Sequence, residues 1–320
     1  MPAPLRWGII STGTIAHTFA SDLQLIDEGT VVAVGSRSIT SANQFADEFS
    51  IPHRHASYEA LVADPDVDVV YVATPHPWHY DNAMLALDHA KAVLVEKSFT
   101  MTAAQARDLV RVARAKRLFL MEAMWTRFLP HVVAIREVLH RGELGEIVAV
   151  MADHGQWFEP DPRSRLFAPE LGGSALLDLG VYPVSFASMI LGTPNRVTAL
   201  VDATVTGVDG QASILLGYES GAHAILTCTS SARSGTRASI VGRDARIEIE
   251  GDFYAPTSFS VISRDGATSR QEFSSSGRGL HYQAIEVARC IGTGQTESPV
   301  MPLDETVAII ETMERVLEFL

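Results

Sequence analysis

The sequence predicts a two-domain protein, with an α/β domain first and an α+β domain after it. The first third alternates short apolar runs with helix-period segments, which is typical of a parallel sheet covered on both faces. Beyond about residue 123, several apolar runs follow one another without helices between them, which indicates a large, mainly antiparallel open sheet. A length of 320 residues also suits two domains. We therefore expect domains over residues 1–123 and 124–320.

The first domain is predicted to be doubly wound, because right-handed crossovers place helices on both faces of a parallel sheet. The expected strands are Arg6–Ile10, Val31–Gly35, Val67–Ala73, Ala92–Glu96 and Leu118–Met121. The expected helices are Ile15–Asp27, Ser41–Phe49, Tyr58–Val62, His79–Asp88 and Ala103–Lys116. Thr102 followed by Gln105 has the spacing of a capping box and predicts where the last of these helices begins. Folds of this kind bind their ligands at the carboxyl ends of the strands.

The second domain is predicted to combine an antiparallel sheet with a few helices. The expected strands are Glu146–Asp153, Arg196–Val205, Ala212–Tyr218, His223–Thr229, Ala238–Glu250 and Ser258–Ser263. The expected helices are Arg127–Arg141, Ser174–Leu191, Leu280–Ile291 and Asp304–Phe319. Apolar and charged residues alternate in Ile247–Glu250, as in a sheet with one solvated face.

Composition excludes several classes of protein. A formal net charge of −13 argues against a nucleic-acid partner, which would select a basic surface. No apolar run approaches the roughly 20 residues of a membrane span, and no signal peptide precedes the first strand, so we expect no membrane. The two cysteines, Cys228 and Cys290, have neither metal-like nor framework spacing. We therefore expect a cytoplasmic protein without disulfides and without a metal.

The first strand-to-helix turn carries a partial dinucleotide-binding fingerprint, G-x-G-x-x-G/A. Ser11 stands at the first glycine position, Gly13 at the second and Ala16 at the third. Gly13 would let the backbone approach a pyrophosphate while N–H groups of the helix point at it. The match is incomplete because Ser11 lacks glycine's conformational freedom, and a turn that merely needs a small residue is the alternative. Its place at the start of an alternating α/β domain predicts a Rossmann domain that binds NAD or NADP.

The end of the second strand indicates NADP in preference to NAD. A site selective for NAD usually carries Asp or Glu here, whereas this chain has Ser36, Arg37 and Ser38. A guanidinium can bind a 2′-phosphate in bidentate fashion, and hydroxyl groups can complete the shell. The alternative is a solvated arginine in a loop.

Candidate catalytic residues follow two later strands and lie on one helix of the second domain. Lys97 follows the fourth strand and is expected to face the cleft, where an ammonium can hold a substrate oxygen or lower a neighbouring pKa. His79 ends a proline-rich loop after the third strand, where a capping or packing role is the alternative. Asp178 and Tyr182 are four residues apart and hence on one helical face, although a buried hydrogen-bonded pair would have the same spacing.

Four segments together resemble the glucose–fructose oxidoreductase/inositol dehydrogenase (Gfo/Idh/MocA) family over nearly the whole chain. They are Ser11–Ala16, Pro75–His79, Glu96-Lys97 and Asp178-x-Gly180-x-Tyr182. Two longer stretches are similar to the branch that contains dimeric dihydrodiol dehydrogenases and NADP-dependent D-xylose 1-dehydrogenases. These stretches are Val70–Tyr80 and Phe119–Pro130.

The resemblance implies that Lys97 and Tyr182 flank the C–OH carbon over the nicotinamide, with Asp178 orienting or tuning them. It also implies that Trp125, Arg127 and Phe128 line the cleft. Serine replaces the family's usual residue twice, Ser98 in place of proline and Ser11 in place of glycine. The residues expected at the cofactor are Ser11, Thr12, Gly13, Thr14, Ile15, Ser36, Arg37, Ser38, Thr74, Pro75, His76, His79, Glu96, Lys97, Trp125 and Arg127.

The leading hypothesis is an NADP-dependent dehydrogenase acting on an aldose or a related cyclic diol or polyol. A nicotinamide-dependent glycosidase and a non-catalytic NADP-binding protein are the alternatives. Net formation of NADPH separates the first from the second, and retention of Lys97, Asp178 and Tyr182 argues against the third. Apolar residues at both parities in Arg196–Val205 and Ala212–Tyr218 predict a homodimer, or a dimer of dimers, held through the second domain's sheet.

Overall fold

The computed structural model describes residues 3–320, which form two compact units. The first contains residues up to Trp125 together with Ser276–Val307, and the second contains Thr126–Ser275 and Ala308–Leu320. The sequence-based division at 123/124 thus misses one feature, because residues 276–307 return to the first unit.

Hydrogen bonds to Asp22 explain this return. The Asp22 carboxylate, 3% exposed, accepts the backbone N–H groups of Arg278 at 2.9 Å and Leu280 at 2.7 Å. The helix that follows, α8 (His281–Gly292), packs against α1 (Thr14–Leu23) and β2 (Gly29–Gly35). A single buried aspartate in a helix carries no sequence signal for a partner more than 250 residues away.

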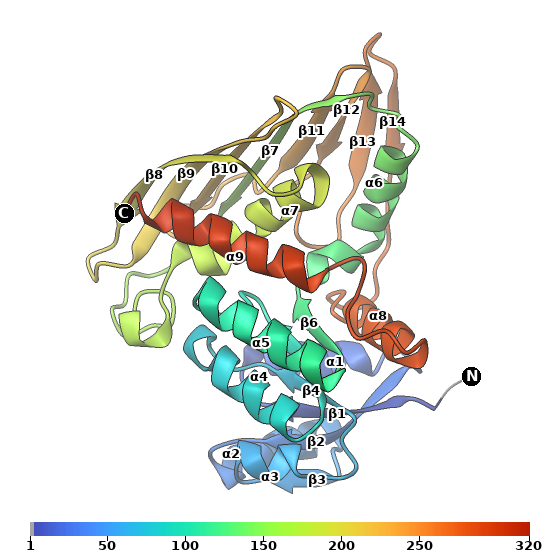
Figure 1. Cartoon of the computed structure of the whole chain (residues 1–320), viewed down its shortest axis with the longest axis vertical. Helices are drawn as coiled ribbons and strands as arrows, with labels where there is room; N and C mark the ends of the chain where they lie inside the picture. Colours follow the sequence, from blue (N-terminus) through green and yellow to red (C-terminus); the bar gives the residue numbers. More distant parts are fainter. Residues whose placement is uncertain (1–2) are drawn as a thin grey trace. The chain divides into compact units, whose positions relative to one another are not determined.

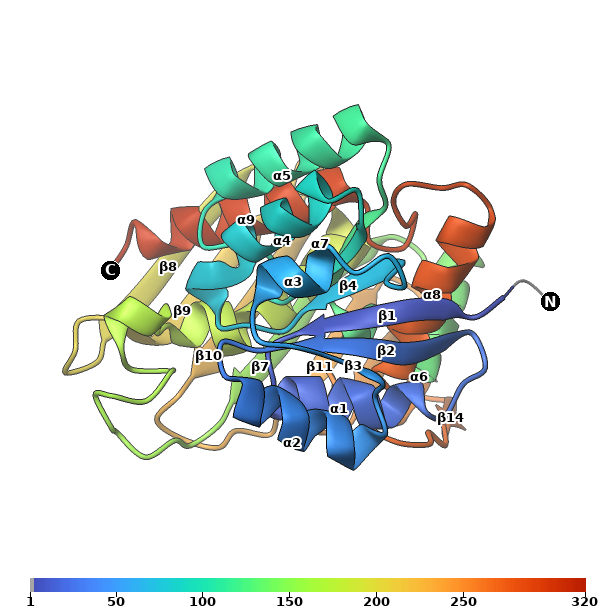
Figure 2. The same cartoon turned by 90° about the horizontal axis from the view of Figure 1, so that it is seen from below.

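The first unit is a doubly wound domain, as predicted. Its six parallel strands lie in the order β3-β2-β1-β4-β5-β6. In addition to β2, the strands are β1 (Leu5–Ile10), β3 (His53–His55), β4 (Val69–Val72), β5 (Ala92–Glu96) and β6 (Leu120–Ala123). Four more helices belong to this unit: α2 (Ile39–Phe49), α3 (Tyr58–Val62), α4 (His79–Asp88) and α5 (Ala103–Lys116). Figure 2 shows α1 and α2 on one face of the sheet and α3, α4 and α5 on the other.

Side-chain caps fix the starts of three of these helices. Ser38, Ser57 and Thr102 each accept the backbone N–H three residues further on, at 3.3, 3.1 and 3.2 Å. The helix start predicted at Thr102 is therefore confirmed, and α5 begins one residue after it. Only the Thr102 half of the capping box forms, because the buried Gln105 Oε1 atom has no hydrogen-bond partner. Each such cap contributes about 1 kcal/mol to the free energy of unfolding and fixes the residue at which the loop ends and the helix begins.

The second unit contains an eight-stranded sheet, which Figure 1 shows with its strands side by side. Its strands are β7 (Ile147–Gly155), β8 (Arg196–Ala203), β9 (Asp209–Gly217), β10 (His223–Thr229), β11 (Ala238–Gly242), β12 (Ala245–Ile249), β13 (Phe259–Ser263) and β14 (Thr268–Gln271). They lie in the order β14-β13-β12-β11-β7-β10-β9-β8, and only β7 and β10 pair in parallel. The predicted strand Ala238–Glu250 is two strands, β11 and β12, which pair with each other.

Three further helices and several short helical turns complete the α structure of the described residues. The helices are α6 (Pro130–His140) and α7 (Val181–Leu191), and α9 (Leu303–Leu317) crosses the division between the units. The 3-10 turns are His76–Trp78, Trp125–Phe128 and Pro169–Leu171, and a π-helical turn occupies Leu176–Gly180. Pro130 at the start of α6 separates it from the preceding turn, so the predicted helix Arg127–Arg141 is divided.

One face of the second sheet is covered and the other is open. Helix α7 packs on β7 and β10, and inward residues of β9 and β10 are buried while alternate residues are exposed. The helical stretch Pro169–Leu191 is long and apolar enough to cross a membrane, but 83% of its most apolar window is buried, as in a core helix. Cys228 and Cys290 are free and buried, and burial raises the pKa of each thiol to about 12.

Candidate active site

The turn after β1 has the geometry of a pyrophosphate-binding turn. Ser11 adopts φ +90°, the region that favours glycine, so the serine makes the tight turn against a steric cost. Gly13 is the N-cap of α1, which has no acidic residue in its first turn. Gly13 and Thr14 are exposed and no side chain caps α1, so the first N–H groups of the helix are available to an anion at this turn.

Gly13 supports a ligand at this turn. Its φ of −79° and ψ of 177° suit any residue, and a Cβ there would meet only the Ser11 Oγ, at 3.8 Å. Neither backbone conformation nor packing within the protein therefore requires glycine. A phosphate approaching the backbone closely would require it, so the turn fits the dinucleotide that the sequence predicts.

The loop after β2 offers hydroxyl and guanidinium groups. Ser36 is 8% exposed, and its Oγ accepts the Ser38 N–H at 3.3 Å, while the Ser38 side chain caps α2. Arg37 is exposed, and its guanidinium lies 5.9 Å from the centre of the Trp78 ring. Burial raises the pKa of Tyr58 and the nearby Arg37 charge opposes that rise, so Arg37 also lies beside this phenol. Two aromatic neighbours keep the guanidinium at the strand end without neutralising it.

His79 joins the ends of β4 and β5. It is 1% exposed, and its ring nitrogens lie 2.7 Å from the Thr74 carbonyl oxygen and 2.8 Å from that of Ser98. Burial lowers the pKa of His79 to about 4, and the Lys97 charge lowers it further. The contacts with the carbonyl groups act in the opposite direction and raise this pKa. The neighbouring His76 packs edge-on against His79 with ring centres 5.5 Å apart. His79 therefore lies between the backbone segments that follow β4 and β5, and its neutral ring donates a hydrogen bond to one of the two carbonyl groups.

Lys97 follows a carboxylate that is held on two sides. Glu96, 5% exposed, accepts a short hydrogen bond from the Tyr71 hydroxyl and the Lys97 N–H at 3.1 Å. The Lys97–Ser98 peptide is cis. Lys97 itself is half-buried at the carboxyl end of β5, the edge of the sheet where doubly wound domains bind ligands.

In the second unit, Asp178 forms a bidentate ion pair that the sequence did not predict. The Arg165 Nη1 and Nη2 atoms lie 3.1 and 3.0 Å from the two Asp178 carboxylate oxygens. The Asp178 side chain is 10% exposed and that of Arg165 is 45% exposed, so the pair connects the interior to the loop between β7 and α7.

A π-helical turn presents Asp178, and two contacts hold this turn on the sheet. Asp209 of β9 is 3% exposed and accepts the Leu176 N–H at 2.6 Å, and burial raises its pKa. A Cβ at Gly180 would meet the Cys228 Sγ at 2.9 Å and the Leu176 Cδ1 at 2.7 Å, so glycine permits this close packing. The α-helical spacing used to place Asp178 and Tyr182 on one face does not apply across this turn.

Tyr182 belongs to a cluster with two other rings. Its ring centre lies 4.8 Å from that of Tyr254 and 5.2 Å from that of His154, and His154 stacks on Tyr254 at 4.4 Å. His154 Nδ1 donates to the Leu179 carbonyl at 3.1 Å, which leaves Nε2 to accept the Gln156 amide at 2.9 Å. The same amide reaches the Tyr254 hydroxyl at 3.2 Å. These contacts join the three buried rings and the Gln156 amide in one cluster.

The structure assigns Trp125 and Arg127 to different units. Trp125 is 4% exposed and closes the first unit's main segment. Arg127 is 3% exposed, and its guanidinium donates to the Ser185 hydroxyl at 3.1 Å and the Ser185 carbonyl at 2.9 Å. These bonds hold Arg127 on α7, close in sequence to Tyr182.

Four residues that contact Asp178 or belong to the ring cluster around Tyr182 were not predicted from the sequence: His154, Gln156, Arg165 and Tyr254. The segment around Arg165 has no regular periodicity, and Tyr254 lies between β12 and β13. Only the alternation in β7, which places His154 on the covered face, could have indicated one of them.

The fold and the cofactor turn define an oxidoreductase with a nucleotide cofactor. A model described as "Oxidoreductase family, NAD-binding Rossmann fold" matches residues 5–124, and one described as "GFO/IDH/MocA C-terminal domain" matches residues 132–251. The chain therefore belongs to the Gfo/Idh/MocA family and is an NAD(P)-dependent dehydrogenase.

Individual relatives agree with this assignment. Trans-1,2-dihydrobenzene-1,2-diol dehydrogenase of Bos taurus is 37% identical over 322 residues, which cover 98% of this chain and 96% of the relative. The structure of a 3-ketoreductase from Actinomadura kijaniata, in complex with NADP and TDP-benzene, matches with TM-score 0.86 and 26% identity, covering 98% and 97% of the two chains. The fold is also shared with an aldose-aldose oxidoreductase from Caulobacter crescentus complexed with glycerol, at TM-score 0.90, 22% identity and 99% and 97% coverage.

Proposed function

We propose that this dehydrogenase uses NADP and transfers hydride between the nicotinamide and a C–OH or C=O carbon of a sugar or a related cyclic diol or polyol. The observation that carries the cofactor choice is the Ser36-Arg37-Ser38 loop, which holds a guanidinium and two hydroxyls where an acid would select NAD. The substrate class is supported by the ring-lined cluster around Tyr182 and by the relatives, one named a diol dehydrogenase and one a ketoreductase solved with NADP.

The reaction assigns separate tasks to the two units. Oxidation of a C–OH carbon removes a hydride and a hydroxyl proton. A bound nicotinamide would accept the hydride, and a protein group must take the proton. We assign Tyr182 to the proton and Lys97 to holding the substrate oxygen. We assign an orienting role to Asp178, which the Arg165 ion pair holds in place. Glu96 and His79 are positioning residues, because both bind the backbone next to Lys97.

The decisive experiment pairs two catalytic variants with two matched controls. Lys97→Met and Tyr182→Phe should each lower kcat by about 10² or more if they take part in proton transfer. Tyr80→Phe and Lys116→Met change the same residue types at ion-paired or hydrogen-bonded surface positions and should leave kcat unchanged. A panel of sugars and diols, followed by NADPH absorbance, identifies the substrate for this comparison.

Three outcomes contradict the proposal. Near-native turnover in both variants would remove Lys97 and Tyr182 from the reaction. Release of an aglycone from a glycoside without net NADPH formation would indicate a nicotinamide-dependent glycosidase. NADP binding without turnover on any sugar or diol would indicate a non-catalytic binding protein.

We further propose that two copies associate through the open face of the second sheet. Met151, Ile225 and Leu215 lie in one row across β7, β10 and β9, and they are 39%, 49% and 48% exposed. Leu200 on β8 is 77% exposed. An exposed apolar row of this kind favours packing of the open sheet face against the same face of a second copy, about a two-fold axis. The free cysteines and the net charge of −13 support a cytoplasmic enzyme without a nucleic-acid partner.

A further inference from the structure

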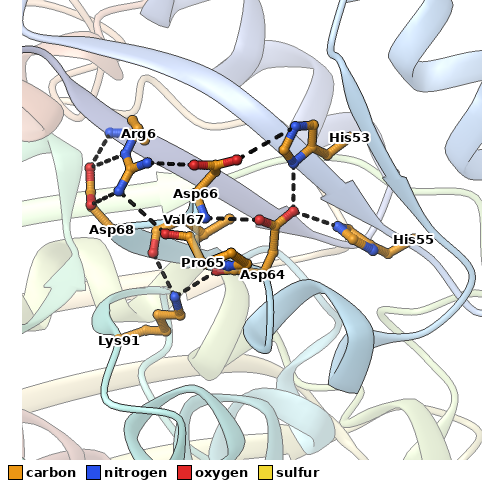
Figure 3. Close-up of polar contacts among 9 residues, drawn as sticks. All are labelled: Arg6, His53, His55, Asp64, Pro65, Asp66, Val67, Asp68 and Lys91. Carbon is orange, nitrogen blue, oxygen red and sulfur yellow. Dashed lines mark hydrogen bonds and ion pairs between the residues drawn. The ribbon is translucent and has the colours of Figure 1, made fainter.

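Three potential metal ligands meet at the edge of the first sheet (Figure 3). His53 and His55 are two residues apart on β3, so both project from the same side of this edge strand. Asp64, whose side chain is 5% exposed, follows α3. Its Oδ2 atom lies 2.6 Å from His53 Nδ1 and 2.9 Å from His55 Nε2, and the three ligand atoms lie within 4.8 Å of one another.

We propose that His53, His55 and Asp64 bind one divalent transition-metal ion of the zinc class. Two imidazole nitrogens and one carboxylate oxygen form a common donor set for such an ion, and a water molecule can take the fourth position. The histidine side chains are 36% and 21% exposed, so an ion has access from solvent. The expectation of no metal rested on the spacing of the cysteines, whereas the ligands proposed here include the His53-x-His55 pair.

The residues around the cluster support its geometry. The Asp64 Oδ1 atom accepts the Asp66 N–H at 2.9 Å, which leaves Oδ2 directed at the two rings. The Asp66 carboxylate lies 3.9 Å from His53 Nε2, the nitrogen that would not bind the metal, and Arg6 holds this carboxylate at 2.8 Å. A separation of 3.9 Å is too long for a hydrogen bond, so Asp66 supports the ring here by its charge.

The position in the fold indicates a structural role. Asp64 precedes β4, and Arg6, which holds the neighbouring acids, lies in β1 near its start. His53 and His55 pair with Ala33 and Gly35 at the carboxyl end of β2, and the His55 carbonyl accepts the Ser36 N–H at 3.1 Å. The cluster therefore joins this end of the edge of the sheet to the loop that precedes β4. An ion here would fix the edge strand β3 to the loop between α3 and β4. The separations of 2.6 and 2.9 Å are those of imidazole N–H groups bonded to Asp64, whereas ligand atoms about 2.0–2.2 Å from one tetrahedral ion lie roughly 3.4 Å apart. Metal binding therefore requires the ligand atoms to separate by less than ~1 Å, and metal titration separates the two cases.

The test uses the full chain without a polyhistidine tag, after treatment with a chelator. Titration with Co²⁺ should give a 1:1 complex with the visible absorption of a four- or five-coordinate ion, and Zn²⁺ should displace it. Saturating Zn²⁺ should raise the melting temperature by a few degrees, because it binds the folded state preferentially. His53→Gln and His55→Gln should each abolish the visible band and this shift. Asp66→Asn should weaken binding by about 10- to 100-fold.

His89→Gln serves as the control, because His89 is exposed on the surface next to α4 and outside the cluster. The melting temperatures of the metal-free variants show that each is folded. The proposal is overturned if Co²⁺ gives no 1:1 band, or if His53→Gln and His55→Gln bind Co²⁺ as the native chain does. Either result would leave the cluster as a hydrogen-bonded contact only.

Discussion

Replacement of Arg37 by alanine is the most direct test of cofactor choice. The Arg37 guanidinium is held near Trp78 and Tyr58, and the hydroxyls of Ser36 and Ser38 flank it in sequence. A hydrogen bond to a charged group contributes about 1.5–3 kcal/mol, which corresponds to roughly 10- to 150-fold in kcat/KM. Arg37 is exposed, so the lower end of this range applies. We expect Arg37→Ala to raise KM for NADP by about tenfold and to leave kinetics with NAD almost unchanged, since NAD has no 2′-phosphate.

The assay compares kcat/KM for both cofactors in the native enzyme, Arg37→Ala and a control. Arg54→Ala is a suitable control because Arg54 lies on β3, the next strand in the sheet, and pairs with Asp47 at 2.7 Å. It should change neither cofactor preference. Equal losses with NADP and NAD in Arg37→Ala would refute the argument, and so would a native enzyme that prefers NAD.

Three further predictions follow from single contacts. Arg165→Ala and Asp178→Asn should each lower kcat/KM several-fold, less than loss of Tyr182, and a double-mutant cycle should show that the two effects are not additive. Burial lowers the pKa of His131 to about 4 against an ordinary 6.5, so the unfolded state binds more protons between these values and His131 alone lowers the free energy of unfolding by about 3 kcal/mol as pH drops from 6.5 to 4; urea unfolding of His131→Asn should lose this part of the slope and keep the part that comes from His79. Ile225→Lys should convert a dimer to a monomer in light scattering at low micromolar concentration, and a native chain that is already monomeric would refute the interface.

The elements predicted best are those whose signal is local. Strand β5 and helices α3, α4 and α5 have the predicted bounds, because caps such as Thr102 and buried Val and Leu runs act within a few residues. Strand β10 also has its predicted bounds, since its alternation is regular.

The elements that were missed lack such a signal. Strand β3 has three residues, two of them histidines, and β14 has the polar sequence Thr-Ser-Arg-Gln. Both lie at sheet edges, where a strand is defined by one neighbour and not by burial of its own side chains. Their pairing depends on the neighbouring strand, so the sequence of the segment alone does not predict it.

The candidate site divides in the same way. Residues that belong to a motif, such as Gly13 and Lys97, could be placed at strand ends by counting from the preceding strand. Arg165 and Tyr254 could not, because tertiary contacts alone bring them to Asp178 and Tyr182. No periodicity connects their loops to the helical segment that they contact.

The first turn shows what a motif specifies physically. The fingerprint asks for glycine at position 11, yet Ser11 adopts φ +90° and the turn still forms. The surrounding strand and helix therefore impose the backbone conformation, and glycine at that position only lowers its cost. Position 13 differs, because its backbone would accept any residue and a Cβ would meet little of the protein. Glycine there makes sense only for a ligand that approaches the backbone, so the position with the least internal constraint gives the stronger evidence for the cofactor.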